Sequence, residues 1–172
     1  MKLGSMIIVV MLVITACFVY ANWEYDPLPG NTKMDRILVE KSKRKMHLIS
    51  NGQIVRTYTI ALGFAPEGHK QREGDGRTPE GLYMIDSKNP HSGYHLNLGI
   101  SYPNEDDRRN AAAAGVPPGG EIKIHGLRNG TWFIGRLHHL MDWTRGCIAL
   151  TNDEMDELYA TGSIGTPIEI RK

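Results

Sequence analysis

Cys147 lies between a glycine and an apolar run in the segment DWTRGCIAL, which covers residues 142–150. The chain has one other cysteine, Cys17, inside an apolar N-terminal run. If Cys17 is removed, lipidated or held in a bilayer, Cys147 has no partner for an intramolecular disulfide. An unpaired cysteine in an exported protein suggests a reactive thiol or an intermolecular disulfide, whereas inert core filler would be the default in a cytosolic protein. We therefore interpret Cys147 as a candidate nucleophile.

A nucleophilic thiol needs a neighbouring base or cation, because a free cysteine has a pKa of about 8.5. His125, His138 and His139 are the candidates. His125 is the best placed, because it stands where a predicted strand gives way to a loop. His138 and His139 are adjacent, so at least one of them is expected to point away from any common target. A zinc site from these histidines and Cys147 lacks CxxC or HxxxH spacing, so we expect no metal and no cofactor.

The elements that must position these residues are mostly strands. Asn51-Gly52 between apolar runs is a strong hairpin signal, so the chain should open as a β-meander. Asn104 is expected to cap a helix that ends at Gly115, and Thr151 with Glu154 forms a capping box for a helix that ends at Gly162. Strands are expected at residues 36–40, 46–49, 54–62, 82–85, 96–100, 121–124 and 167–170.

Charge and loop composition exclude several function classes. The net charge of +1 gives no field that would attract nucleic acid. The glycine-rich loop 63–81 is not followed by GK[ST], so it is not a nucleotide loop. The basic cluster 41–45 is expected to be a solvated turn, and the acidic run 153–157 a solvated helix face.

The N-terminus indicates export. An apolar run follows Lys2, and the next charge is Glu24. Residues 1–21 are an export signal, a lipoprotein signal that would lipidate Cys17, or a membrane anchor that would associate with the inner membrane. A spacer is expected at 22–35, and one domain at 36–172.

Three motifs stand in one order along the domain: GDGRTPEG at 74–81, Ile124-His125-Gly126, and DWTRGCIAL. Together they closely resemble the L,D-transpeptidase catalytic domain (YkuD type) of bacterial cell walls, from about residue 36 to residue 170. The resemblance implies a mainly β domain, a β-sandwich or barrel with two short helices. It also implies a thiol enzyme of the cell envelope or periplasm that acts on peptidoglycan stem peptides.

The resemblance assigns roles by position. Cys147 would be the nucleophile and His125 the general base and acid, oriented by the backbone carbonyl of Gly126. Backbone N–H groups around Gly146 and Cys147 would help to hold the oxyanion. Attack on the third residue of a tetrapeptide stem would release D-alanine. The acyl group would pass to another stem (a 3→3 cross-link), to a lysine of an envelope protein, or to water.

The chain departs from the common pattern at two positions beside the nucleophile. Arg145 replaces a common histidine, and Ala149 replaces an arginine or asparagine. Recognition of a substrate carboxylate would then pass to Arg145, Arg136 or Arg77, although Arg77 could instead only shape its turn. Trp143 is expected to pack under the loop. A hydrolytic carboxypeptidase or endopeptidase of the same fold, and a non-catalytic wall-binding module, remain open.

Overall fold

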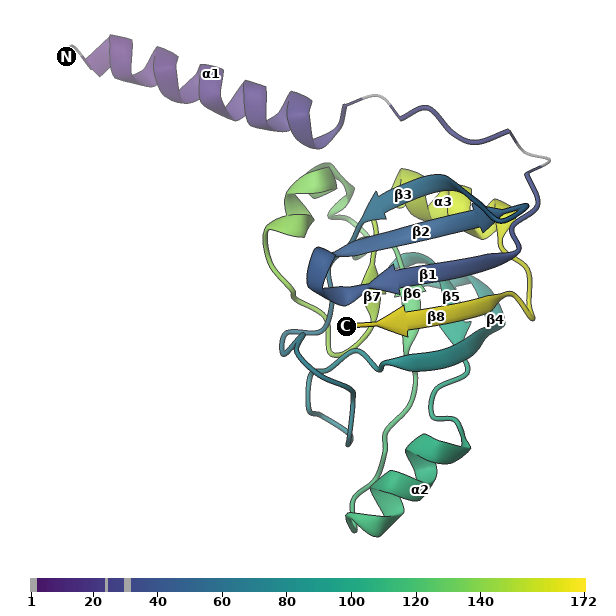
Figure 1. Cartoon of the computed structure of the whole chain (residues 1–172). Helices are drawn as coiled ribbons and strands as arrows, with labels where there is room; N and C mark the ends of the chain where they lie inside the picture. Colours follow the sequence, from purple (N-terminus) through teal and green to yellow (C-terminus); the bar gives the residue numbers. More distant parts are fainter. Residues whose placement is uncertain (1–2, 24, 30–31) are drawn as a thin grey trace.

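The computed structural model describes residues 3–23, 25–29 and 32–172 of the chain (Figure 1). It begins with α1 (Leu3–Ala21), a helix that lies outside the β domain in Figure 1. Its segment Gly4–Ala21 has a mean hydropathy of 2.4 and is long and apolar enough to cross a membrane, a test that a signal sequence also passes. The helix agrees with the export segment expected at this end.

One sheet of eight strands forms the domain, in the order β3-β2-β1-β8-β4-β5-β6-β7. The expected meander is present, because β1, β2 and β3 pair antiparallel in sequence. The last strand, β8, then inserts parallel to β1 and antiparallel to β4. The strands are β1 (Arg36–Glu40), β2 (Lys45–Ser50), β3 (Gln53–Thr59), β4 (Gly81–Ser92), β5 (His95–Ile100), β6 (Lys123–His125), β7 (Ile148–Ala149) and β8 (Pro167–Arg171).

The two ends of this strand order meet. Just beyond β3, Ala61 forms a bridge with Ala149 of β7, and its N–H donates to the Ala149 carbonyl at 3.1 Å. A second bridge joins Gly63 to Thr144. The sheet therefore curls and closes on itself, as the predicted β-sandwich or barrel requires.

The core is apolar and lies inside this curl. Side chains of every strand contribute, together with Met155 and Leu158 of α3 (Asn152–Thr161). The capping box of Thr151 and Glu154 starts α3 as predicted. The other predicted helix is α2 (Glu105–Ala113), which Asn104 caps together with Asp107.

Two short 3-10 helices complete the fold, and one of them was not expected. The first is η1 (Lys41–Lys43), in the basic turn. The second is η2 (Trp132–Leu140), a segment for which no helix was expected, and it is interrupted at Gly135 (φ 46°, ψ −133°). The N–H₂ of Asn22, just after α1, donates to the carbonyl of Phe133 at 3.1 Å. The strand expected from residue 121 begins at Lys123, because Glu121 has a left-handed φ of 56°.

The expectation that the charged runs are solvated is wrong at three positions. One is Glu154, which is buried in the capping box of α3. Lys41 is 2% exposed, and its ammonium donates to the carbonyls of Gly68 and Thr78 and to Glu80. Glu157 is also buried, and its carboxylate accepts hydrogen bonds from Tyr25, Leu28, Arg56 and Tyr58. Buried charges need such partners. Lys41 and Glu157 thus join distant segments, and residues 25–28 of the expected spacer pack on the domain.

Candidate active site

The segment that carries Cys147 is fixed at its start by Asp142. The carboxylate of Asp142 forms an ion pair with Arg44 at 2.7 Å and accepts the N–H of Leu62 at 2.9 Å. Arg44 lies between β1 and β2, and Leu62 follows β3. The cysteine loop is therefore attached to the meander at the opposite end of the strand order.

Thr144 and Gly146 set the shape of the turn before the nucleophile. The Thr144 hydroxyl donates to the carbonyl of Cys147 at 2.7 Å and accepts the N–H of Gly146 at 3.1 Å. Gly146 has a φ of 128°, and a Cβ there would lie 2.7 Å from the carbonyl oxygen of Arg77. Only glycine fits this position without strain, because it combines a left-handed φ with a close backbone contact.

His125 is the last residue of β6, which pairs parallel with β7 directly after Cys147. Its ring is almost fully buried, and Nδ1 lies 2.7 Å from the carbonyl oxygen of Gly126. A carbonyl only accepts, so Nδ1 carries the proton and Nε2 keeps a lone pair. The contact expected between His125 and Gly126 is therefore present, and it fixes the tautomer that a general base needs.

Two aromatic rings hold the His125 imidazole in place. The Tyr94 ring lies 4.8 Å from it between centroids, and Trp143 lies 5.6 Å away in an edge-on arrangement. Trp143 packs in this cluster as expected, and it also lines the neighbouring cavity. Tyr94 carried no sequence signal, because it lies in the turn between β4 and β5, far from the motifs along the chain.

Cys147 and His125 open onto the same cavity, which has a volume of ≈ 700 Å³. Its polar lining includes two cations, Arg145 and Lys123. Residues of the β4 end and the β4–β5 turn complete it: Asn89, His91, Ser92, Gly93 and Tyr94, together with Asn97, Trp143 and Thr144. The structure thus joins the predicted nucleophile and base in a concave site that opens to solvent, where a peptide can reach both.

The electrostatics favour an uncharged pair in the free protein. Burial raises the pKa of Cys147 above its ordinary value, although the N–H and the charge of Lys123 oppose this. Burial lowers the pKa of His125, and the charge of Lys123 adds to that effect, while the Gly126 carbonyl opposes it. The thiol of Cys147 points to the carbonyl of Glu121 at 3.6 Å. A neutral imidazole that lines the same cavity as a neutral thiol suits general-base activation during attack.

The three arginines expected to bind a carboxylate lie in different places. Arg145 is exposed at the rim of the cavity, and no hydrogen bond or ion pair within the described part of the chain engages its guanidinium. Arg77 lines a separate hollow with Lys41, and its guanidinium donates to the His69 carbonyl at 3.4 Å. Arg136 lines another hollow beside the end of α1. Of these three arginines, only Arg145 therefore lines the cavity that contains Cys147.

Lys123 is a cavity residue that the sequence analysis missed. Its ammonium pairs with the carboxylate of Glu121 at 2.6 Å. Side chains two positions apart on a strand share a face, so a strand that presents His125 to the cavity presents Lys123 to it as well. This spacing could have identified Lys123 from the sequence.

Two other expectations need correction. The N–H of Gly146 already donates to Thr144, so it is not free to bind an oxyanion. The adjacent histidines also do not point apart: the rings of His138 and His139 lie 3.9 Å from each other. The imidazole of His138 reaches the Trp143 N–H at 3.5 Å.

Comparison with known proteins agrees with this geometry. The family model described as the L,D-transpeptidase catalytic domain (YkuD) matches residues 34–170. YafK of Escherichia coli (strain K12), whose name marks it as a candidate L,D-transpeptidase, is 30% identical over 117 residues. That match covers 65% of this chain and 39% of YafK, so the chain corresponds to well under half of its relative.

Solved structures share the fold. A mutant of the helical cell shape determining protein Pgp2 from Campylobacter jejuni has a TM-score of 0.60 and 26% identity, over 83% of this chain and 48% of that one. Bd1075 of Bdellovibrio bacteriovorus has a TM-score of 0.57 and 26% identity, over 85% and 54%. An L,D-transpeptidase of Xylanimonas cellulosilytica has a TM-score of 0.52 at 15% identity, over 86% and 65%, which supports the fold alone. This chain has the sequence motifs and the closed sheet described above, and the family model matches most of its length. It therefore belongs to the L,D-transpeptidase catalytic domain family.

Proposed function

We propose that the chain is an exported cysteine acyltransferase of peptidoglycan, an L,D-transpeptidase, with Cys147 as nucleophile and His125 as base. One observation carries the proposal: both residues line one open cavity, and the Nδ1–H of His125 is held by the Gly126 carbonyl. This arrangement leaves Nε2 of His125 as the only ring nitrogen able to accept a proton. The apolar helix α1 is compatible with export, either as a signal or as an anchor in the inner membrane.

In the acylation step, Sγ of Cys147 attacks the carbonyl carbon of the third residue of a tetrapeptide stem while Nε2 of His125 takes the thiol proton. The oxyanion of the tetrahedral intermediate is bound by the N–H of Cys147, for which the described residues supply no acceptor. The C–N bond then breaks, and His125 returns the proton to the amine of the leaving D-alanine. The product is a thioester on Cys147.

The thioester then passes to an acceptor. An amine attacks the carbonyl carbon and gives its proton to His125, the C–S bond breaks, and the thiol regains that proton. A stem amine yields a 3→3 cross-link and a lysine of an envelope protein yields an anchored protein. Water in the same position yields carboxypeptidase activity. The first half of the reaction is identical in all three cases.

Arg145 is our candidate for the group that binds a substrate carboxylate. Its guanidinium is exposed on the cavity that contains the thiol and is free to form a bidentate pair. Lys123 also faces this cavity, but its ammonium is paired with Glu121. Arg77 and Arg136 face other hollows, so a direct role for either at this thiol would require a substrate that extends beyond the cavity.

The test is the intact mass of the purified full chain after exposure to a carbapenem, which acylates an activated thiol. We expect one adduct on the parent chain and none on Cys147→Ala, which keeps Cys17 as an internal control. Incubation with a disaccharide tetrapeptide should then release D-alanine, and product masses distinguish cross-link from hydrolysis. A folded parent chain that forms no adduct and releases no D-alanine would contradict the proposal and favour a wall-binding module.

A further inference from the structure

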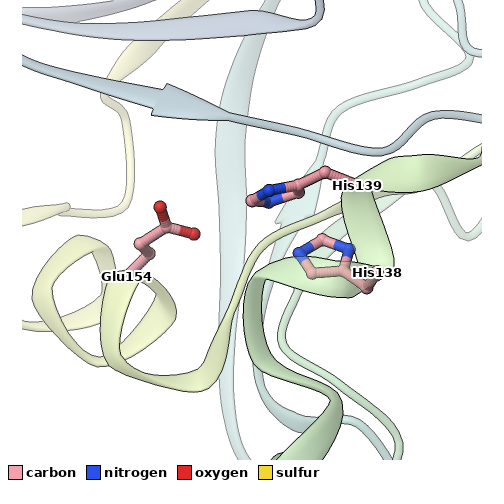
Figure 2. A group of neighbouring side chains, drawn as sticks. All are labelled: His138, His139 and Glu154. Atoms are coloured by element: carbon pink, nitrogen blue, oxygen red, sulfur yellow. The ribbon is translucent and has the colours of Figure 1, made fainter. Parts of the chain in front are cut away.

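A second cluster of reactive side chains lies beside the active site, where the end of η2 meets α3. His138 and His139 approach Glu154 from the opposite side, as Figure 2 shows. One possible ligand atom from each residue lies within 4.8 Å of the other two. No step of the proposed acyl transfer uses any of these three residues.

The two histidines have unsatisfied polar atoms. The Nε2 atoms of His138 and His139 are buried, and no described residue gives either a hydrogen-bond partner. Leaving such a group unsatisfied destabilises the folded protein. An imidazole nitrogen that lacks a hydrogen-bond partner among the described residues is available as a metal ligand.

Glu154 is positioned by contacts that leave one oxygen available. Its Oε2 accepts the N–H of Thr151 at 2.9 Å and the Thr151 hydroxyl at 2.8 Å. Its Oε1 takes part in none of the hydrogen bonds formed by the described residues. A carboxylate with one oxygen held by neighbouring donors and the other without a partner among the described residues can act as a metal ligand that has its supporting contacts.

We propose that His138, His139 and Glu154 bind a divalent transition-metal ion, for which zinc is the best fit. Two imidazoles and one carboxylate form a common zinc ligand set, with water in the fourth position. Bonds of about 2.0–2.1 Å place neighbouring ligand atoms about 3.4 Å apart, so each side chain moves inward by less than about 1 Å. The ion would join η2 to α3 and lie next to Trp143, which packs on His125.

The fluorescence of Trp143 can report whether a metal ion binds to His138. In the structure the Nε1–H of Trp143 points at Nδ1 of His138 at 3.5 Å, which requires an unprotonated Nδ1. A metal on Nε2 forces the proton onto Nδ1. The long contact with Trp143 is then lost, and the fluorescence of this tryptophan should change as the ion binds.

The experiment titrates cobalt(II) and then zinc into the full chain after chelator treatment. The chain carries Cys17→Ser and Cys147→Ala, so that no thiol competes for the ion. We expect one equivalent of cobalt with d–d absorption bands, displacement by zinc, and a fluorescence change that Trp143→Phe abolishes. The experiment does not measure acyl transfer. Failure of the chain to bind metal would therefore not contradict the proposed function.

Ligand variants decide the assignment. His139→Asn and Glu154→Gln should each weaken zinc binding at least 100-fold, and glutamine keeps the capping box. His47→Asn is the matched control, because it removes an imidazole that pairs with Glu40 on the sheet surface, and its affinity should equal that of the parent. No binding by the parent, or equal binding by His139→Asn and Glu154→Gln, would overturn the site and leave water as the partner of both rings.

Discussion

The hydroxyl of Thr144 donates to the carbonyl oxygen of Cys147 at 2.7 Å and accepts the N–H of Gly146 at 3.1 Å. One side chain thus closes the turn that presents the thiol. Because both partners are buried or half-buried, losing the hydroxyl should cost about 1–3 kcal/mol and misplace Cys147.

Thr144→Val should therefore lower the acylation rate by at least about tenfold, measured as carbapenem adduct formation against time, and should lower the midpoint of thermal unfolding. Thr144→Ser keeps the hydroxyl and should retain most of both. Equal acylation by Thr144→Val and the parent would show that this turn does not depend on the hydroxyl.

Arg145→Ala should reduce kcat/KM for a tetrapeptide by about 10- to 100-fold, because a bidentate pair with a carboxylate contributes about 1.5–3 kcal/mol. The unfolding midpoint should not change, since the side chain is exposed. Arg128→Ala, which removes an exposed arginine away from the cavity lining, is the control. Unchanged kinetics for Arg145→Ala would exclude it as the carboxylate contact.

The rate of acylation should rise with pH and then level off. Burial lowers the pKa of His125 below 6.5 and raises that of Cys147 above 9.0. The base is thus active only above its lowered pKa, and the rate should fall in acid below pH 6.5 and persist above pH 8. A preformed thiolate–imidazolium pair would instead lose activity as the imidazolium deprotonates.

Lys123 lowers the pKa of His125 by its charge. Lys123→Ala should therefore move the acid limb of the rate profile to higher pH. Lys43→Ala, which removes an exposed lysine paired with Glu40, should leave the limb in place.

Glu157→Gln should destabilise the domain by roughly 3 kcal/mol, because a buried carboxylate is lost and Arg56 keeps an uncompensated charge. Burial alone would raise the pKa of Glu157, but hydrogen bonds from Tyr25, Tyr58 and Arg56 outweigh it and lower the pKa. The carboxylate's stabilising effect is thus present above pH 4.5 and is lost as pH falls through its lowered pKa.

Chemical unfolding at pH 7 measures this loss for Glu157→Gln. Limited proteolysis should also cut residues 25–28 faster in that variant, because Tyr25 and Leu28 both donate to Glu157. Asp153→Asn, on the same helix but outside this network, should behave like the parent.

Local signals explain what the sequence predicted correctly. The capping boxes at Asn104 and Thr151 involve residues three positions apart, and Asn51-Gly52 fixes its hairpin within two residues. The pairing of Cys147 with His125 came from motifs whose order matches a known family. In each case the relevant partners are close in sequence or belong to a recognisable pattern.

The remaining features depend on tertiary contacts that no local pattern encodes. Lys41 and Glu157 are charged residues in charged runs, and only their distant partners make burial favourable. His138 and His139 converge because η2 packs against α3, whereas adjacency alone favours divergence. The engaged N–H of Gly146 follows from the rotamer of Thr144.

The bridge between Ala61 and Ala149 has a consequence for how the protein matures. Contacts between residues so far apart in sequence form late, because closing the intervening chain costs conformational entropy. While the chain is still incomplete or unfolded, the turn that presents the Cys147 thiol therefore lacks its contacts with the meander. We expect this thiol to become reactive only when these final contacts form.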